Sequence, residues 1–226
     1  MDIGKTLSFP LEDKDWAVKI LIGGVLLLIP IVDFFVFGYI FRVLQKAAQD
    51  GIYEFPAWDY WGSLFSQGFF VFLMGLVYFL APGILYGIGG ALLGGSFLMA
   101  SRIAYGFAPL AGLGILFMAL GCIIGFLIAL IAPMALTLYA ATGEFGQIFN
   151  FGDIFSRIGS NLGNYILAIL VYLGLMIVLG IVRKIPILGF IIDIFAGFYV
   201  MLVISYLFGT VFRGIGAAFP PSDPPM

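Results

Sequence analysis

The chain has 226 residues, of which 63% are apolar and only 10% are charged, and its mean hydropathy is +1.17. A soluble domain of this size cannot hide so much apolar side chain, so the composition indicates an integral membrane protein. A formal net charge of −2, without a cluster of Lys and Arg, excludes nucleic acid as a partner. The same hydrophobicity excludes intrinsic disorder.

Two absences limit the chemistry of the chain. The sequence has no histidine, which is the commonest general base and metal ligand. Its single cysteine, Cys122, lies within an apolar run, where a buried structural role is the ordinary interpretation. We therefore expect no catalytic residue, no metal site and no cofactor, and we expect that the protein is not an enzyme.

Long apolar runs follow a polar N-terminal segment. A helix that crosses a bilayer needs roughly 20 apolar residues, and two of the runs greatly exceed that length. Arg102 separates these two runs, so we expect them to be distinct helices. The predicted spans lie near residues 68–93, 112–141, 160–182 and 187–212.

Aromatic residues with polar neighbours, which are typical of the lipid headgroup level, precede the second apolar run. We interpret the segment Trp58–Gln67 as an amphipathic helix that lies on the membrane surface. A related segment follows residue 150. The predicted interfacial anchors are Trp16, Trp58, Trp61, Phe65, Phe151 and Phe155.

The two aromatic segments belong to an internal repeat. Trp61–Gln67 (WGSLFSQ) and Phe151–Arg157 (FGDIFSR) share one pattern at an offset of 90 residues, and each precedes a pair of apolar runs. Both copies run in the same direction, which makes the repeat parallel. We predict one membrane domain over residues 1–226, divided into an N-terminal segment 1–57, repeat units 58–143 and 150–213, and a Pro-rich tail 214–226.

The first apolar run, Ile20–Leu44, has two interpretations. It is either a single fifth span or a re-entrant hairpin that breaks at Pro30, with Asp33 in the first turn of its second leg. A single span leaves six Lys and Arg residues on one side of the membrane and four on the other. A re-entrant hairpin leaves seven and three, the asymmetry expected of the positive-inside rule, and places both termini in the cytoplasm.

Four motifs carry a family resemblance. FPLEDKDW at Phe9–Trp16, IPIVDF at Ile29–Phe34, GYIFRVL at Gly38–Leu44 and FPAWDYWGSLF at Phe55–Phe65 resemble domain-of-unknown-function family 4013, a family of prokaryotic multi-pass membrane proteins. The resemblance implies a location in the cytoplasmic membrane of a prokaryote. It implies no reaction, substrate or catalytic residue.

Three charged residues form the candidate intramembrane polar site: Asp33, Asp193 and Arg102. A charge at the centre of a bilayer is costly, so these residues are candidates for an ion, proton or headgroup site. The structural alternative places each aspartate near a helix N-terminus beyond a proline, and places Arg102 at the interface.

Small-xxx-small pairs indicate helix packing, because glycine lets two backbones approach closely. The candidate packing residues are Gly83, Gly87, Gly90, Gly94, Gly121, Gly125, Gly159 and Gly163.

Together these features predict an all-α, polytopic transmembrane helical bundle with four full spans, an N-terminal re-entrant or spanning segment, and amphipathic interfacial helices. The function that they favour is a non-catalytic accessory or scaffold subunit of a membrane complex. The alternative is a transporter, channel or lipid-handling protein. The expected partners are membrane lipids and other membrane protein subunits or further copies of the chain.

Overall fold

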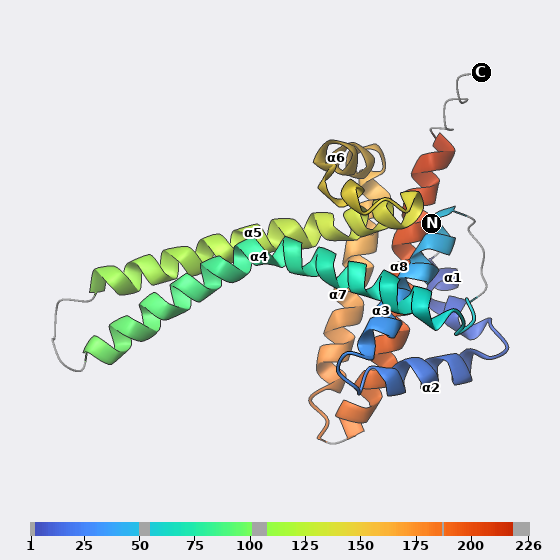
Figure 1. Ribbon diagram of the computed structural model, residues 1–226, viewed down its shortest axis with the longest axis horizontal. Coiled ribbons are helices and arrows are strands. Elements are labelled where there is room, and N and C mark those ends of the chain that lie inside the picture. The colour runs from blue at the N-terminus through green and yellow to red at the C-terminus, as the bar shows by residue number, and fades with distance from the viewer. Residues whose placement is uncertain (1–2, 50–54, 101–107, 187, 219–226) are drawn as a thin grey trace. The chain divides into compact units, whose positions relative to one another are not determined.

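The computed structural model describes residues 3–49, 55–100, 108–186 and 188–218, and this part of the chain is helical without strands (Figure 1). Four of its helices are long and apolar enough to cross a membrane, as the sequence predicts. The helices are α1 (Ile3–Ser8), η1 (Phe9–Leu11), α2 (Trp16–Leu26), α3 (Asp33–Gln49), α4 (Trp61–Ala100), α5 (Ala108–Thr142), η2 (Phe145–Phe149), α6 (Phe151–Ser160), α7 (Leu162–Val182) and α8 (Leu188–Ala218).

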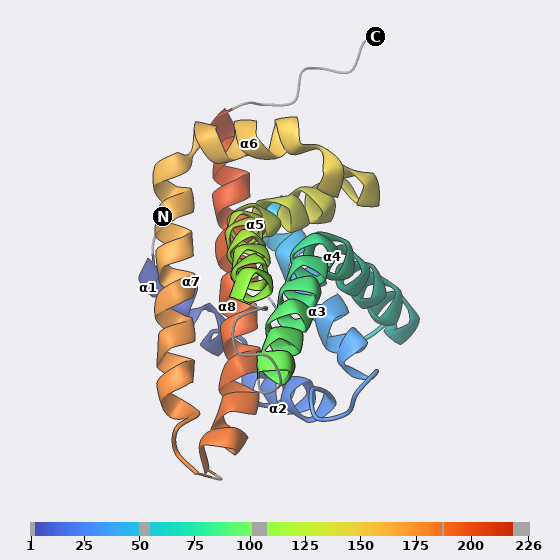
Figure 2. The ribbon, with the colours of Figure 1, turned by 90° about the vertical axis from the view of Figure 1, so that its left-hand side faces the viewer.

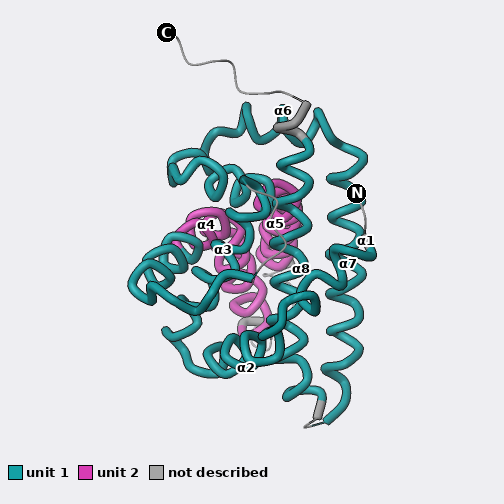
Figure 3. Tube along the Cα trace, turned by 90° about the vertical axis from the view of Figure 1, so that its right-hand side faces the viewer, with its two compact units in different colours: residues 1–72, 133–226 teal, residues 73–132 magenta. Residues whose placement is uncertain are grey.

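The chain forms two compact units (Figure 3). Unit 1 combines Met1–Phe72 with Pro133–Met226, and unit 2 is Leu73–Ala132. Helices α4 and α5 each contribute to both units. The boundaries of the two units fall inside the predicted repeat unit 58–143. The division into compact units therefore does not follow the predicted repeat, and the parallel repeat stays a prediction.

The first apolar run is not one helix. Helix α2 ends at Leu26 and α3 begins at Asp33, and Ile31 in the turn between them has a φ of 75°. Pro30 lacks an N–H to continue a helix, and a positive φ at a β-branched residue ends regular structure. The prediction of a single fifth span is therefore wrong, while the entry of this helix pair into the membrane stays a prediction.

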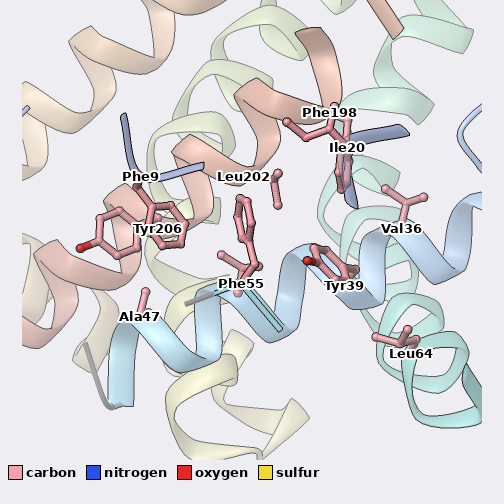
Figure 4. Packing of buried hydrophobic residues seen from close by; sticks show 11 residues of the cluster. Phe9, Ile20, Val36, Tyr39, Ala47, Phe55, Leu64, Phe198, Leu202 and Tyr206 are labelled. Atoms are coloured by element: carbon pink, nitrogen blue, oxygen red, sulfur yellow. The ribbon is translucent and has the colours of Figure 1, made fainter. Parts of the chain in front are cut away.

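The core of unit 1 lies between α3 and α8. Gly209 of α8 lets the two helices approach closely, because a Cβ added there would lie 2.5 Å from the Cβ of Ala47. Figure 4 shows Tyr39 and Ala47 of α3 on one side of the core and Phe198 and Tyr206 of α8 on the other. The buried cluster contains Phe9, Ile20, Val36, Tyr39, Val43, Ala47, Phe55, Leu64, Phe198, Leu202 and Tyr206.

Helix α2 packs on α8 through two adjacent glycines. A Cβ added to Gly23 would lie 2.3 Å from the ring of Phe198, and one added to Gly24 would lie 2.4 Å from the ring of Phe195. The aromatic rings of α8 thus occupy the space that larger side chains of α2 would need. Figure 2 shows α7 running beside α8 in the opposite direction.

The start of α4 packs against α3 rather than forming a separate surface helix. A Cβ on Gly38 would lie 1.9 Å from the carbonyl oxygen of Leu64, and one on Gly68 would lie 1.8 Å from that of Phe34. The predicted amphipathic helix Trp58–Gln67 therefore differs from the structure in its bounds, because the helix begins at Trp61 and continues into the apolar run; its position on the membrane surface stays a prediction. These backbone contacts hold the segment in line with the apolar run, and α4 continues without a break from Trp61.

The second aromatic segment does form a separate short helix, α6. The side chain of Asn150 caps it by accepting a hydrogen bond from the backbone N–H of Asp153 at 3.2 Å. Asp153 in turn pairs with Arg157 across one helical turn at 2.9 Å. A break at Asn161 then separates α6 from the span α7.

Candidate functional site

Asp193 lies near the start of α8 and is paired. Its Oδ1 is 2.8 Å from Nε of Arg183, the residue that follows α7, so the ion pair bridges the turn between the two helices. Asp193 is 16% exposed and Arg183 is 65% exposed. The ion pair with Asp193 raises the pKa of the Arg183 guanidinium. The ion pair connects the end of α7 to the start of α8.

The other two members of the predicted polar site do not join this pair. Asp33 is the first residue of α3, where its half-buried carboxylate faces the positive end of the helix dipole. Among the described residues, the ion pair of Asp193 is made by Arg183 and not across to α3. Arg102 lies outside the described residues.

Within unit 2, α4 and α5 touch through glycines that the sequence analysis did not select. A Cβ on Gly89 would lie 2.8 Å from the carbonyl oxygen of Gly114, and one on Gly114 would lie 2.9 Å from that of Gly89. Gly121 and Gly125, which were selected, lie more loosely against Pro82 and its neighbours. Gly121 and Gly125 thus lie at the α4–α5 contact at ordinary van der Waals distance, and their role in helix packing stays a prediction.

The remaining selected glycines face open space. Among the residues that the structure describes, nothing lies within 4 Å of a Cβ added to any of six: Gly83, Gly87, Gly90, Gly94, Gly159 and Gly163. These six glycines therefore make no close helix contact among the described residues, and packing against a partner stays the prediction for them. Helix α4 carries glycines both on the face that contacts α5 and on a face that contacts no described helix. The spacing of the small residues does not show which of the two faces packs against α5.

A pocket of about 450 Å³ lies between α3 and the start of α4, wholly within unit 1. Arg42 and Lys46 of α3 lie one helical turn apart on one wall. Ser63, in the first turn of α4, lies on the other. The segment between the helices completes the lining with Pro56, Ala57, Asp59 and Tyr60.

Buried contacts hold this connecting segment against α3. The hydroxyl of Tyr39 donates a hydrogen bond of 2.8 Å to the carbonyl oxygen of Pro56, and the Tyr39 ring stacks on Trp58 with 4.0 Å between ring centroids. The indole N–H of Trp58 donates to the carbonyl oxygen of Lys19 at 3.3 Å. Trp58, predicted to be an interfacial anchor, is thus a packing residue, and one pocket wall is fixed by it.

The two cations of the pocket differ in their partners. Nη1 of Arg42 donates to Oδ1 of Asp59 at 2.7 Å and to the carbonyl oxygens of Asp59 and Ala57 at 3.3 and 3.5 Å. Lys46 forms no ion pair with the residues that the structure describes. Among the described lining residues, one carboxylate therefore faces two cations.

This pocket was not predicted from the sequence, where Arg42 and Lys46 count only among the Lys and Arg residues that set orientation. The pocket forms because residues 55–60 lie against α3. A pair of cations one turn apart, followed by aromatic residues at the headgroup level, is the signal that could have indicated it.

The aromatic residues near the pocket are accessible. Tyr60 is 76% exposed, and Trp61 and Phe65 at the start of α4 are exposed. Of the other predicted anchors, Trp16 on α2 and Phe151 and Phe155 on α6 are exposed as well. These positions suit the boundary between headgroups and acyl chains.

No group of three metal-binding side chains occurs within the described ranges. In unit 2 the Tyr86 hydroxyl lies 2.9 Å from Sγ of Cys122, a contact between α4 and α5.

Four apolar helices of spanning length, in a described chain without strands, define a multi-pass helical membrane protein. It belongs to the family described as Protein of unknown function (DUF4013), which matches residues 22–188 and so confirms the resemblance seen in the sequence. The first of the four motifs lies before the matched range. Comparison with curated proteins and with solved structures gave no match.

Proposed function

We propose that the chain is a non-catalytic accessory or scaffold subunit of a membrane complex, and that it acts in the cytoplasmic membrane of a prokaryote. Its partners are membrane lipids together with other membrane protein subunits or further copies of the chain. The cellular location rests on the family resemblance. The role as a subunit rests on one feature of unit 2.

That feature is a strip of open glycines on α4. Gly83, Gly87, Gly90 and Gly94 fall within about 60° of one another around the helix, at 3.6 residues per turn. Gly89, which touches α5, lies roughly a third of a turn away. In lipid, where apolar surface gives no drive to associate, a flat glycine strip favours close contact with another helix.

Purification of the full chain in a gentle detergent, followed by mass measurement, tests the proposal. We expect a complex heavier than one chain, and we expect Gly87→Leu with Gly90→Leu to release the monomer. Gly174→Leu is the matched control, because Gly174 of α7 also faces open space but stands outside the strip. Recovery of the unaltered chain as a lone monomer would contradict the proposal.

Lipid handling is the second candidate function, and the pocket of α3 supports it. Transport of an ion through Asp33 and Asp193 has less support, because Asp193 is paired with Arg183 at the end of a hairpin. A flux assay of Asp193→Asn in reconstituted vesicles tests that alternative, since a folded variant without its flux would revive it.

A further inference from the structure

We propose that the pocket between α3 and the start of α4 binds the phosphate of an anionic glycerophospholipid headgroup, with Lys46 and Arg42 as its cationic ligands. This proposal concerns a ligand site and does not depend on the role as a subunit.

The first step is charge. Lys46 is half-buried and has no ion pair with the described residues, and its neighbour Arg42 is engaged through Nη1 alone. The Arg42 side chain is 14% exposed and its hydrogen bonds with the described residues all use Nη1, so it can support a phosphate that Lys46 binds. Arginine is suited to a forked contact with phosphate, and lysine adds a compact charge.

The second step is shape. A volume of about 450 Å³ lies within the range of roughly 300–1,000 Å³ that is usual for small-molecule sites. The Ser63 hydroxyl adds a donor opposite the cations. Ser63 also belongs to the first turn of the 40-residue helix α4, whose positive dipole end adds to the attraction for an anion.

The third step separates a lipid from a soluble anion. The pocket lies where the polar connecting segment meets the apolar helix α4, so a bound phosphate would sit at headgroup level. Tyr60 on the rim is almost fully accessible, and Phe70 lies two turns below Ser63 on the same face of α4 and is exposed. Acyl chains attached to that phosphate would meet an apolar surface.

The carboxylate of Asp59 determines which of the two cations contributes more to phosphate binding. Asp59 is half exposed and already accepts from Arg42, so a second anion competes with it for that guanidinium but not for Lys46. Lys46 is therefore the side chain on which binding depends most, and it is the residue to change first.

Native mass spectrometry of the delipidated full chain, titrated with phosphatidylglycerol or phosphatidylcholine, tests the proposal. We expect tighter binding of phosphatidylglycerol, weakened about five-fold by Lys46→Gln, the effect usual for one cation near an anionic lipid. Lys46→Arg keeps the charge and should stay within about two-fold of the unaltered chain. Lys14→Gln, an equal loss of charge at an exposed site before α2, should have no effect.

Three results would overturn the proposal. Lys46→Gln and Lys14→Gln could weaken binding equally, which would show attraction to total charge. Phosphatidylcholine could bind as tightly as phosphatidylglycerol. Excess inorganic phosphate could displace the lipid completely, which would assign the pocket to a free anion. The helical circular dichroism signal and the elution volume show which variants fold. If Lys46→Gln does not fold, the binding of Lys46→Arg is compared with that of the unaltered chain instead.

Discussion

Gly89 of α4 and Gly114 of α5 face each other across unit 2, each so close that a Cβ on it would lie within 3 Å of the other's carbonyl oxygen. Two helices approach in this way only where neither carries a side chain. Leu93 and Met118 lie beside the contact. The pair therefore sets the spacing of the hairpin.

Replacing Gly89 with leucine should separate α4 from α5 locally. Overpacking of a well-packed contact costs about 1–3 kcal/mol, and here the obstacle is backbone, which cannot rotate away. Thermal unfolding in detergent measures the loss. Gly95→Leu is the control, because no described residue lies within 4 Å of a Cβ at that position. Equal stability of the two variants would contradict the tight contact.

Tyr39→Phe should loosen the segment that lines the pocket. The change removes the hydrogen bond to Pro56 and leaves a buried carbonyl oxygen without its partner, which costs about 1–3 kcal/mol. Limited proteolysis of the segment and thermal unfolding both report the effect. Tyr60→Phe, at an exposed position, should leave both unchanged; a similar response in the two variants would speak against the hydrogen bond.

Asp13 should make the N-terminal part of unit 1 sensitive to acid. Burial alone would raise the pKa of Asp13, but the hydrogen bond from Lys19 at 2.7 Å and that from the backbone of Asp15 hold it below its ordinary value of 3.8. The stabilisation is therefore complete above about pH 3.8 and is lost as the pH falls through the lower, folded value.

Tryptophan fluorescence followed from neutral to acidic pH measures this transition. The unaltered chain should lose stability in the acid range, and Asp13→Asn should be less stable at neutral pH and lack that part of the acid dependence. Asp15→Asn is the control at an exposed position. Identical acid profiles for the chain and Asp13→Asn would refute the role of this ion pair.

The Arg183–Asp193 pair should matter little to stability. The Arg183 side chain follows the end of α7 and is largely exposed, and ion pairs at exposed sites add little to stability. A double-mutant cycle of Asp193→Asn and Arg183→Gln should give a coupling energy close to zero. A much larger coupling would mean that the pair lies deep in the hydrocarbon, which would favour an intramembrane site at Asp193.

Cysteine labelling tests the topology. In a Cys122→Ser background, Lys14→Cys, Lys46→Cys and Arg157→Cys should react with an impermeant thiol reagent on one side of the membrane, and Lys184→Cys on the other. This result follows from four spans with the α2–α3 pair kept on the side of the N-terminus. Labelling of Lys14→Cys and Lys46→Cys from opposite sides would show that the pair crosses.

The four spans could be predicted because each is a long apolar run, of which only the last carries a charge within it, Asp193. The break between α2 and α3 is one of two interpretations of the sequence, and the positive φ of Ile31 in the structure decides between them. The start of α4 could not be predicted, because the backbone contact of Gly38 with Leu64 joins residues that no local pattern connects. The same holds for Gly89 and Gly114, and for the pocket, which depends on how Tyr39 and Trp58 fold the connecting segment back.

The length of α4 has a consequence for the bilayer. Its apolar stretch Trp61–Leu98 has 38 residues, about 57 Å of helix at 1.5 Å per residue, whereas a hydrocarbon core is about 30 Å thick. A straight helix would need a tilt of about 60° to keep that stretch in hydrocarbon, against an average near 20°. Mismatch of this size predicts that the tilt of α4 depends on the thickness of the bilayer around it.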